Sequence, residues 1–295
     1  MEDRRDDIER GMAVIPTLDE IMADDADPTT RRIYQEIQQA LRVPFVNFIF
    51  RMLANRPAFF QAAWARLHPI AQSRAFEDAA DRLRTMATIG AVPVEGRLAD
   101  VGDDLRRIRA FAATIHHVVP KLLLAATAFD LDAAGERAPD AATGSEGDLP
   151  DLGIKAPGMV EGATSISMVD PKAAEGPLAE LFQDIQSTHG HPGVATYYRA
   201  LAQWPELLDD LWQAVRPVVG SAAFEARRGE LVDAAAEEIR ALRSAARANG
   251  LMTDDPPALR AEEREELRAI LAVFRFRIIP DLNLVVPLTR RLLER

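Results

Sequence analysis

Residues 34–77 read YQEIQQALRVPFVNFIFRMLANRPAFFQAAWARLHPIAQSRAFE, and residues 182–225 read FQDIQSTHGHPGVATYYRALAQWPELLDDLWQAVRPVVGSAAFE. The two segments align without a gap at a constant offset of 148 residues, in a chain of 295 residues. Identical pairs at that offset include Pro44/Pro192, Arg51/Arg199, Trp64/Trp212, Pro69/Pro217 and Glu77/Glu225. Because tryptophan, proline and arginine recur in one register, we predict an internal duplication.

The repeat extends in both directions with small insertions and deletions. Residues 15–21 (IPTLDEI) resemble residues 166–172 (ISMVDPK), and residues 116–126 (HHVVPKLLLAA) resemble residues 276–286 (FRIIPDLNLVV). A segment rich in Gly, Pro, Ala and Asp separates the copies and is expected to be a flexible surface linker. The predicted organisation is an N-terminal extension at 1–13, a first helical repeat at 14–130, the linker at 131–162 and a second helical repeat at 163–295.

Local sequence patterns favour helices throughout the chain. Apolar residues recur every three or four positions, as at Leu231, Ala235, Ile239 and Leu242, and Ala, Leu, Arg and Glu dominate. Prolines lie between these stretches, where helices begin or end. We therefore predict an all-α fold in which two tandem helical repeats form a pseudo-dimer within one chain. A ligand site is expected in the cleft between the repeats.

The composition excludes several classes of function. The chain has no cysteine, which excludes disulfides, thiol nucleophiles and thiolate-bound metals. Its formal net charge of −11 argues against a nucleic-acid partner. No uncharged apolar run approaches the ~18 residues of a membrane span, and the charged start MEDRRDDIERG lacks the apolar core of a signal peptide. We expect a cytoplasmic protein with no membrane partner; its oligomeric state stays open.

Two pairs of histidines are candidates for chemistry. His116 and His117 precede an apolar stretch, so each is either a buried imidazole with a hydrogen-bond partner or a catalytic or ligand-binding group. His189 and His191 flank Gly190 in an irregular segment before a helix. This H-x-H spacing could hold a metal together with His116 or His117. The alternative is that they are loop histidines without a ligand.

A single carboxylate in an apolar segment is the third candidate. Asp281 lies in RIIPDLNLVV and needs a partner or an unusual pKa. Its counterpart in the first repeat is Lys121, which also follows a proline. We predict a Lys121–Asp281 ion pair across the pseudo-symmetry axis, in preference to a catalytic base at Asp281.

Several long strings resemble the group I 2-haloacid dehalogenases, the all-helical type that accepts both substrate enantiomers. They are LRVPFVNFIFRMLANRPAFFQAAWARL, AADRLR, VPKLLL and YRALAQWPELL, and the resemblance covers residues 14–130 and 163–290. It implies two helical repeats around an active site, where an aspartate activates water to displace halide at the α-carbon with inversion. It also implies an asparagine that positions the water, aromatic residues around the substrate, and no metal or organic cofactor.

The resemblance assigns site residues one at a time. Phe45 stands where the family has tryptophan, Phe48 keeps an aromatic ring, and Thr196 stands where the family has serine. The catalytic aspartate falls on Tyr197, and the asparagine falls on Val119. A phenol with a pKa near ~10 is a poor base at neutral pH, and valine has no polar atom to orient water.

Three functions follow as hypotheses. The first is a hydrolase that acts on a small 2-halo carboxylic acid, with the base relocated to His116 or His117 and with Tyr197 donating a hydrogen bond to the substrate. The second is a protein that binds a small carboxylic acid or apolar ligand in the same cleft without dehalogenation. The third is a metal- or haem-binding protein that uses the four histidines. Phe45, Phe48, Val119, Thr196 and Tyr198 are the predicted substrate-binding residues.

Overall fold

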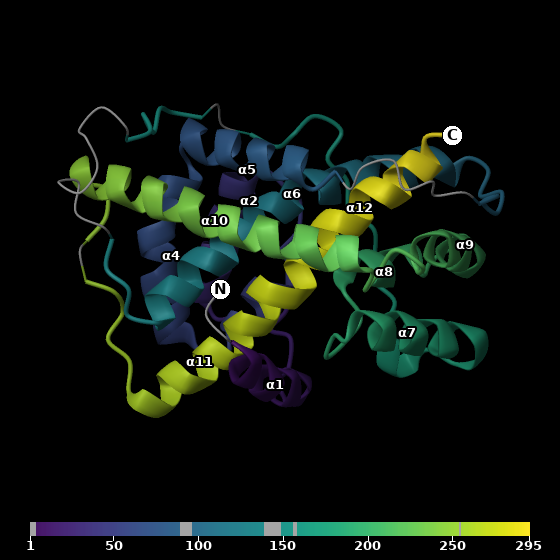
Figure 1. Cartoon of the computed structure of the whole chain (residues 1–295), viewed down its shortest axis with the longest axis horizontal. Helices are drawn as coiled ribbons and strands as arrows, with labels where there is room; N and C mark the ends of the chain where they lie inside the picture. Colours follow the sequence, from purple (N-terminus) through teal and green to yellow (C-terminus); the bar gives the residue numbers. More distant parts are fainter. Residues whose placement is uncertain (1–3, 89–95, 139–148, 156–157, 254) are drawn as a thin grey trace.

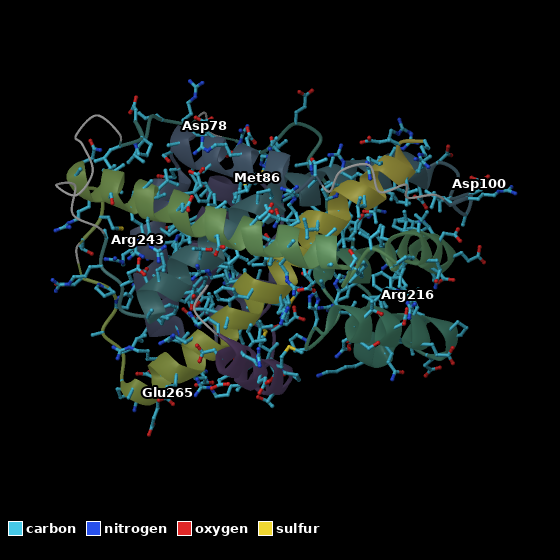
Figure 2. All side chains as sticks on the ribbon, viewed as in Figure 1. Asp78, Met86, Asp100, Arg216, Arg243 and Glu265 are labelled. Atoms are coloured by element: carbon cyan, nitrogen blue, oxygen red, sulfur yellow. The ribbon has the colours of Figure 1, made fainter. Side chains whose placement is uncertain are left out.

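The computed structural model describes residues 4–88, 96–138, 149–155, 158–253 and 255–295 (Figure 1). Helices make up 68% of the structure, and its described residues form no strand beyond one isolated bridge between Ser73 and Ile154. The all-α prediction is therefore confirmed. Acidic side chains such as Asp78, Asp100 and Glu265 are exposed and point outward, which places much of the negative charge at the surface (Figure 2).

The helices fall into two similar series. The first is α1 (Arg5–Val14), η1 (Ile15–Thr17), α2 (Pro28–Leu41), α3 (Phe48–Leu53), α4 (Pro57–Ala71), α5 (Arg74–Met86) and α6 (Asp104–Ala133). The second is η3 (Pro171–Ala173), α7 (Gly176–His189), α8 (Thr196–Leu201), α9 (Pro205–Val215), α10 (Ala222–Ala248), α11 (Ala261–Val273), the π-helical turn η4 (Phe274–Ile278) and α12 (Ile279–Leu293). Helices α2 and α7, and likewise α3 and α8, begin and end 148 residues apart.

Individual hydrogen bonds also recur at the same offset. The indole Nε1 of Trp64 donates to Glu36 at 2.9 Å, and that of Trp212 donates to Asp184 at 2.7 Å. The side chains of Ser73 and Ser221 each accept a hydrogen bond from the backbone N–H three residues later, as helix N-caps do. The first-turn N–H groups of α5 and α10 thus find the same kind of hydrogen-bond acceptor.

Helices α2 and α7 end in the same left-handed conformation. The residue after α2 is Arg42, with φ of 65°, and the residue after α7 is Gly190, with φ of 64°. A side chain with a Cβ atom is strained in this region, whereas glycine adopts it freely. The chain therefore tolerates backbone strain at one helix end and avoids it at the other.

Gly190→Ala is expected to lower the free energy of unfolding by about 1–2 kcal/mol because alanine is strained at positive φ. The added methyl group would meet no atom within 4 Å, so the loss measures the backbone alone. Arg42→Ala is the matched control, since that position already carries a Cβ atom, and it should change stability by less than about 0.5 kcal/mol. Urea unfolding of both variants checks this, and equal losses would contradict it.

Helix α6 forms the centre of the molecule and packs on α5, α10, α11 and α12. By length and composition alone it could cross a membrane, although Lys121 interrupts its apolar run. The most apolar 18-residue window of α6 is 78% buried inside the protein, however. This burial is typical of a core helix, and it accounts for the apolar composition of α6 without a membrane.

The N-terminal helix and the described part of the predicted linker also pack on the core. Helix α1 lies against α11, and Gly11 approaches the backbone of Ala269 so closely that a Cβ atom there would lie 2.1 Å from its carbonyl oxygen. In the predicted linker, Lys155 is buried and donates to the carbonyls of Ala40 and Ala71. Residues 149–155 are thus tied to the first series at Lys155, while Ile154 is 96% exposed at the surface. The linker bounds stay a prediction, because α6 extends to Ala133 and residues 139–148 lie outside the described residues.

Candidate active site

A small cavity lies among α3, α6, α8 and α12. Its volume is about 30 Å³, which is room for about two water molecules. It is lined by Asn47, Phe48, Ile49, Ile115, Val119, Leu122, Ala195, Thr196, Tyr197, Phe274, Ile278, Ile279 and Leu282. The lining contains no carboxylate, imidazole, ammonium or guanidinium group among the described residues, and its polar side chains are those of Asn47, Thr196 and Tyr197.

The hydroxyl group of Tyr197 is already bonded within the protein. It lies 2.7 Å from the Oγ1 of Thr289, which itself donates to the carbonyl of Val286, so Tyr197 is the donor of the pair. The ring of Tyr197 stacks on that of Phe111, with centroids 6.1 Å apart. Burial raises the pKa of Tyr197 to about 12. Tyr197 is therefore a neutral phenol at pH 7 and cannot act as a base.

The side chain of Asn47 has a buried oxygen atom that accepts no hydrogen bond from the protein. It occupies the N-cap position of α3, where asparagine usually bonds to the first turn, but its side chain forms no such bond. The residue is 5% exposed, and its Oδ1 has no hydrogen-bond partner. A buried polar atom without a partner is costly, so a ligand or water molecule in the cavity would stabilise it.

The structure brings four of the predicted site residues together. Phe48, Val119, Thr196 and Tyr197 all line the cavity. Phe45 does not line it; its ring packs against Phe111, with centroids 6.5 Å apart. Tyr198 points elsewhere, since its hydroxyl group lies 2.8 Å from the Nε2 of His189. Sequence reasoning missed Asn47; an unused N-cap asparagine is visible only in the structure.

His116 and His117 lie on α6 but do not line the cavity. The Nδ1 of His116 lies 2.7 Å from the Nη1 of Arg290, and the Nε2 of His117 lies 2.7 Å from the Nζ of Lys121. Burial and nearby positive charges lower the pKa of His116 to about 4 and that of His117 to about 3. Each is therefore neutral and accepts a hydrogen bond from a cation. Their role as a base stays a prediction.

The predicted Lys121–Asp281 ion pair is wrong. The Nζ of Lys121 donates to Glu77 at 2.7 Å and to the carbonyl of Leu41 at 3.1 Å. Burial lowers the pKa of Lys121 to about 7, although Glu77 opposes the shift. Lys121 bonds to groups on α2 and α5 of its own series, and Asp281 likewise bonds within the second series. Each of these buried charges thus finds its partners within its own series of helices.

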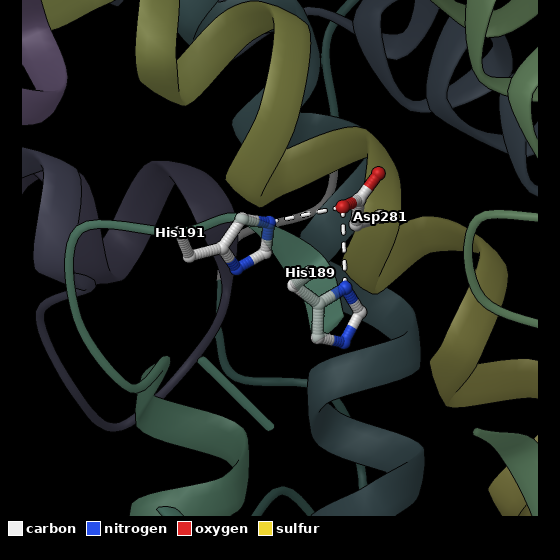
Figure 3. A group of neighbouring side chains, drawn as sticks. All are labelled: His189, His191 and Asp281. Carbon is white, nitrogen blue, oxygen red and sulfur yellow. Dashed lines mark hydrogen bonds and ion pairs between the residues drawn. The ribbon is translucent and has the colours of Figure 1, made fainter. Parts of the chain in front are cut away.

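Asp281 forms a buried cluster with two histidines (Figure 3). Its Oδ2 lies 3.2 Å from the Nδ1 of His189 and 2.9 Å from the Nε2 of His191, and its Oδ1 accepts from Arg228 at 3.1 Å. Burial alone would raise the pKa of Asp281, but the hydrogen bonds from the two histidines outweigh it and hold the pKa below its usual range. Asp281 is therefore an ionised acceptor, and both imidazoles donate to it.

The same three side chains form a donor set that suits a divalent metal. From the sequence we expected His116 or His117 to join His189 and His191 at a metal, but those two residues bond to Arg290 and Lys121 instead. In the cluster, Arg228 occupies the second carboxylate oxygen, and its positive charge opposes a cation beside it. The cluster is accounted for by hydrogen bonds, and it orients Tyr198 through His189.

Residues 44–197 match the model of a family described as "Halocarboxylic acid dehydrogenase DehI". A configuration-inverting 2-haloacid dehalogenase of Alcaligenes xylosoxydans xylosoxydans is 30% identical over 239 residues, which cover 78% of this chain and 78% of the relative. The chain belongs to the DehI family.

Other relatives agree with membership of the DehI family. An (R)-2-haloacid dehalogenase of Pseudomonas putida is 29% identical over 262 residues, covering 85% of each chain. A solved structure described as "The complex structure of D-2-haloacid dehalogenase with L-LA" has the same fold, with a TM-score of 0.78 and 24% identity. That match covers 94% of this chain and 96% of the other. The resemblance to haloacid dehalogenases is confirmed at the level of the DehI family.

Proposed function

We propose that this DehI-family protein binds a small 2-substituted carboxylic acid, of the 2-halo or 2-hydroxy type, in the cavity among α3, α6, α8 and α12. We further propose that it does not activate water there by the route that the family resemblance implies. The observation that carries both statements is the lining, which is apolar apart from three neutral polar side chains. Apolar cavities with a few convergent polar groups are the usual form of small-molecule sites.

The cavity is also where two related halves would meet. Its lining includes five pairs of positions at the repeat offsets: 47/195, 48/196, 49/197, 119/279 and 122/282. Paired positions around one cavity are expected when two repeats pack about a pseudo-twofold axis. We therefore propose the intrachain pseudo-dimer as the architecture that builds the site.

Water attack at the α-carbon requires a base beside the water. The family resemblance places that base at Tyr197 and the water-positioning asparagine at Val119. Here Tyr197 is a neutral phenol whose proton is bonded to Thr289, and Val119 has no polar side-chain atom. Loss of a positioned base typically costs about 10²–10⁴ in rate. Slow or absent hydrolysis is the expected consequence.

Asn47 is the proposed recognition group. Its amide N–H can donate to a carboxylate oxygen, and its unpartnered Oδ1 can accept from a 2-hydroxyl group or from water. The bond would form in a buried site, where hydrogen bonds to charged groups contribute most. Because the cavity is compact, an acid of a few heavy atoms enters only as the lining side chains repack.

Asn47→Leu is expected to weaken binding of 2-chloropropionate or lactate by about 10–100-fold, because a buried hydrogen bond to a charged group contributes about 1.5–3 kcal/mol. Isothermal titration with both enantiomers measures this. Asn55→Ala is the matched control: it lies just beyond the other end of α3 and bonds to the Asp19 carbonyl, outside the cavity. Wild-type protein that binds none of these acids would contradict the proposed function.

Hydrolytic dehalogenation is the second candidate, and the relatives named as 2-haloacid dehalogenases favour it. It needs a base that the cavity lining does not supply, such as the predicted His116 or His117. Halide release from D- and L-2-chloropropionate tests it. Release by the wild type that is lost in His116→Ala or His117→Ala would support this candidate over the first.

A further inference from the structure

Two arginines at equivalent positions, one buried and one partly buried, share one carboxylate. Arg51 and Arg199 lie 148 residues apart, and their side chains are 4% and 14% exposed. Glu20 accepts from the Nε of Arg51 at 2.8 Å and from the Nη1 of Arg199 at 2.6 Å. The other side-chain hydrogen bonds of Arg51 are with neutral groups: the carbonyl of Val46, the sulfur of Met168 and the hydroxyl of Thr196 at 3.3 Å. Two positive charges therefore face one negative charge.

The residue equivalent to Glu20 in the second series is a methionine, Met168. The N–H of Ile21 donates to the carbonyl of Arg51 at 3.3 Å, and the N–H of Val169 donates to that of Arg199 at 2.9 Å. These two backbone bonds lie 148 residues apart, so the residues just before them, Glu20 and Met168, occupy equivalent places. The sequence alignment of 15–21 with 166–172, which pairs Glu20 with Pro171, is therefore out of register here. The Sδ of Met168 lies 3.9 Å from the Nη2 of Arg51. A neutral side chain thus stands where symmetry would put an anion.

Burial makes the missing charge significant. It lowers the pKa of Arg51, and the positive charge of Arg199 adds to this shift while Glu20 opposes it. A guanidinium group that is incompletely neutralised out of water favours binding of an anion, and carboxylates match its planar donor geometry.

The arginine pair lies beside a surface cleft of about 750 Å³, which we call the outer cleft. Arg199, Glu20 and Lys172 line it, and Asp170 at its edge accepts from the backbone N–H of Lys172. Its apolar lining comes from both series of helices and their flanking segments: Ile15, Leu18, Met52, Ile166, Met168 and Val194. Phe48 lines both the outer cleft and the cavity.

We propose that the outer cleft binds an apolar monocarboxylic acid, with its carboxylate held by Arg199 and Lys172 and its hydrocarbon chain on the methionine- and isoleucine-rich lining. The carboxylate supplies the second negative charge that the Arg51–Arg199 pair lacks. Inorganic phosphate would bring more charge toward Glu20 and Asp170 and would leave the apolar lining uncovered. This site is separate from the cavity and does not rest on the proposed function.

The test titrates the purified protein with straight-chain alkanoates from acetate to octanoate at constant ionic strength. The affinity is expected to rise about fourfold for each methylene group that the lining buries. Met168→Glu supplies the missing carboxylate within the chain and should weaken octanoate binding at least tenfold without lowering the melting temperature. Met168→Gln has the same length and no charge, and it should bind octanoate within threefold of the wild type.

Two outcomes would overturn the proposal. The first is equal binding of octanoate by the wild type and by Met168→Glu. The second is an affinity for alkanoates that does not change with chain length and equals the affinity for inorganic phosphate. Asn47→Leu separates the two sites, since it should weaken 2-chloropropionate binding in the cavity and leave octanoate binding unchanged. Failure of the proposed function at the cavity would therefore be distinguished from failure of the outer-cleft proposal.

Discussion

Asp281→Ala is expected to lower the free energy of unfolding by about 3–5 kcal/mol, because it removes one partner from a buried charge cluster. Arg228 would lose its bond to Asp281, and the N–H groups of His189 and His191 would lose their acceptor. Urea unfolding monitored by tryptophan fluorescence measures the loss. A loss below about 1 kcal/mol would show that the cluster contributes little to stability.

Two variants separate the charge of Asp281 from its shape. Asp281→Asn keeps the size of the side chain and one acceptor oxygen, so its loss should be smaller than that of Asp281→Ala. Glu225→Gln changes a carboxylate that also pairs with Arg228 but is 47% exposed, and it should cost less than about 0.5 kcal/mol.

The stabilisation of the folded protein by Asp281 decreases as the pH falls. Since its pKa in the folded protein lies below the ordinary value near ~3.9, its stabilisation is fully present above that value and is lost as the pH falls further. The part of the stability difference between wild type and Asp281→Ala that comes from this carboxylate should therefore shrink as the pH falls below about 4. Burial lowers the pKa of His191, so both proteins lose stability below about pH 6.5, where the unfolded chain takes up a proton.

The double variant Tyr197→Asp/Val119→Asn is expected to release halide from 2-chloropropionate at least about 100-fold faster than the wild type. Both residues line the cavity, so the change places a carboxylate and a carboxamide beside the same small space. The carboxylate can accept a proton from water, and the carboxamide can orient that water. Halide release with D- and L-substrate measures the gain.

Tyr197→Asn/Val119→Asn is the matched control for the double variant. It has the same side-chain shapes but no base, and it should release no halide above the blank. Loss of the Tyr197 contacts with Thr289 and Phe111 lowers stability, so melting temperatures of both variants are compared first. A folded double variant that binds the acid without releasing halide would show that the cavity does not align water with the α-carbon.

Local features of the fold were predictable because they depend on residues close together in the sequence. The helical period, the prolines at the starts of α2, α7 and α9, and the serine caps at Ser73 and Ser221 are each set within a few residues. The expectation that prolines lie only between helices is wrong, because Pro69, Pro120 and Pro287 lie inside α4, α6 and α12. The 148-residue register also anticipated matching helix bounds, as in α2 and α7. Four cavity residues were found in advance because a family resemblance, rather than spacing, pointed to them.

The buried polar contacts were not predictable. Lys121 and Asp281 were recognised as charges that need partners, yet Lys121 bonds to Glu77 and Asp281 bonds to His189, His191 and Arg228. The partners are 44 to 92 residues away in the chain. Pseudo-symmetry suggested that the two charges meet, whereas packing kept each within its own series of helices.

The sequence by itself determined that the chain is helical and without cysteine, and it predicted a duplication with Tyr197 and Val119 at the positions of the family's aspartate and asparagine. Only the tertiary structure decided which side chains face the cavity, that Asn47 is left unbonded there, and that Arg51 and Arg199 share one carboxylate. The physical reason is that secondary structure follows short-range periodicity and capping. Neutralisation of buried charge instead depends on contacts between distant residues, which exist only once the helices have packed.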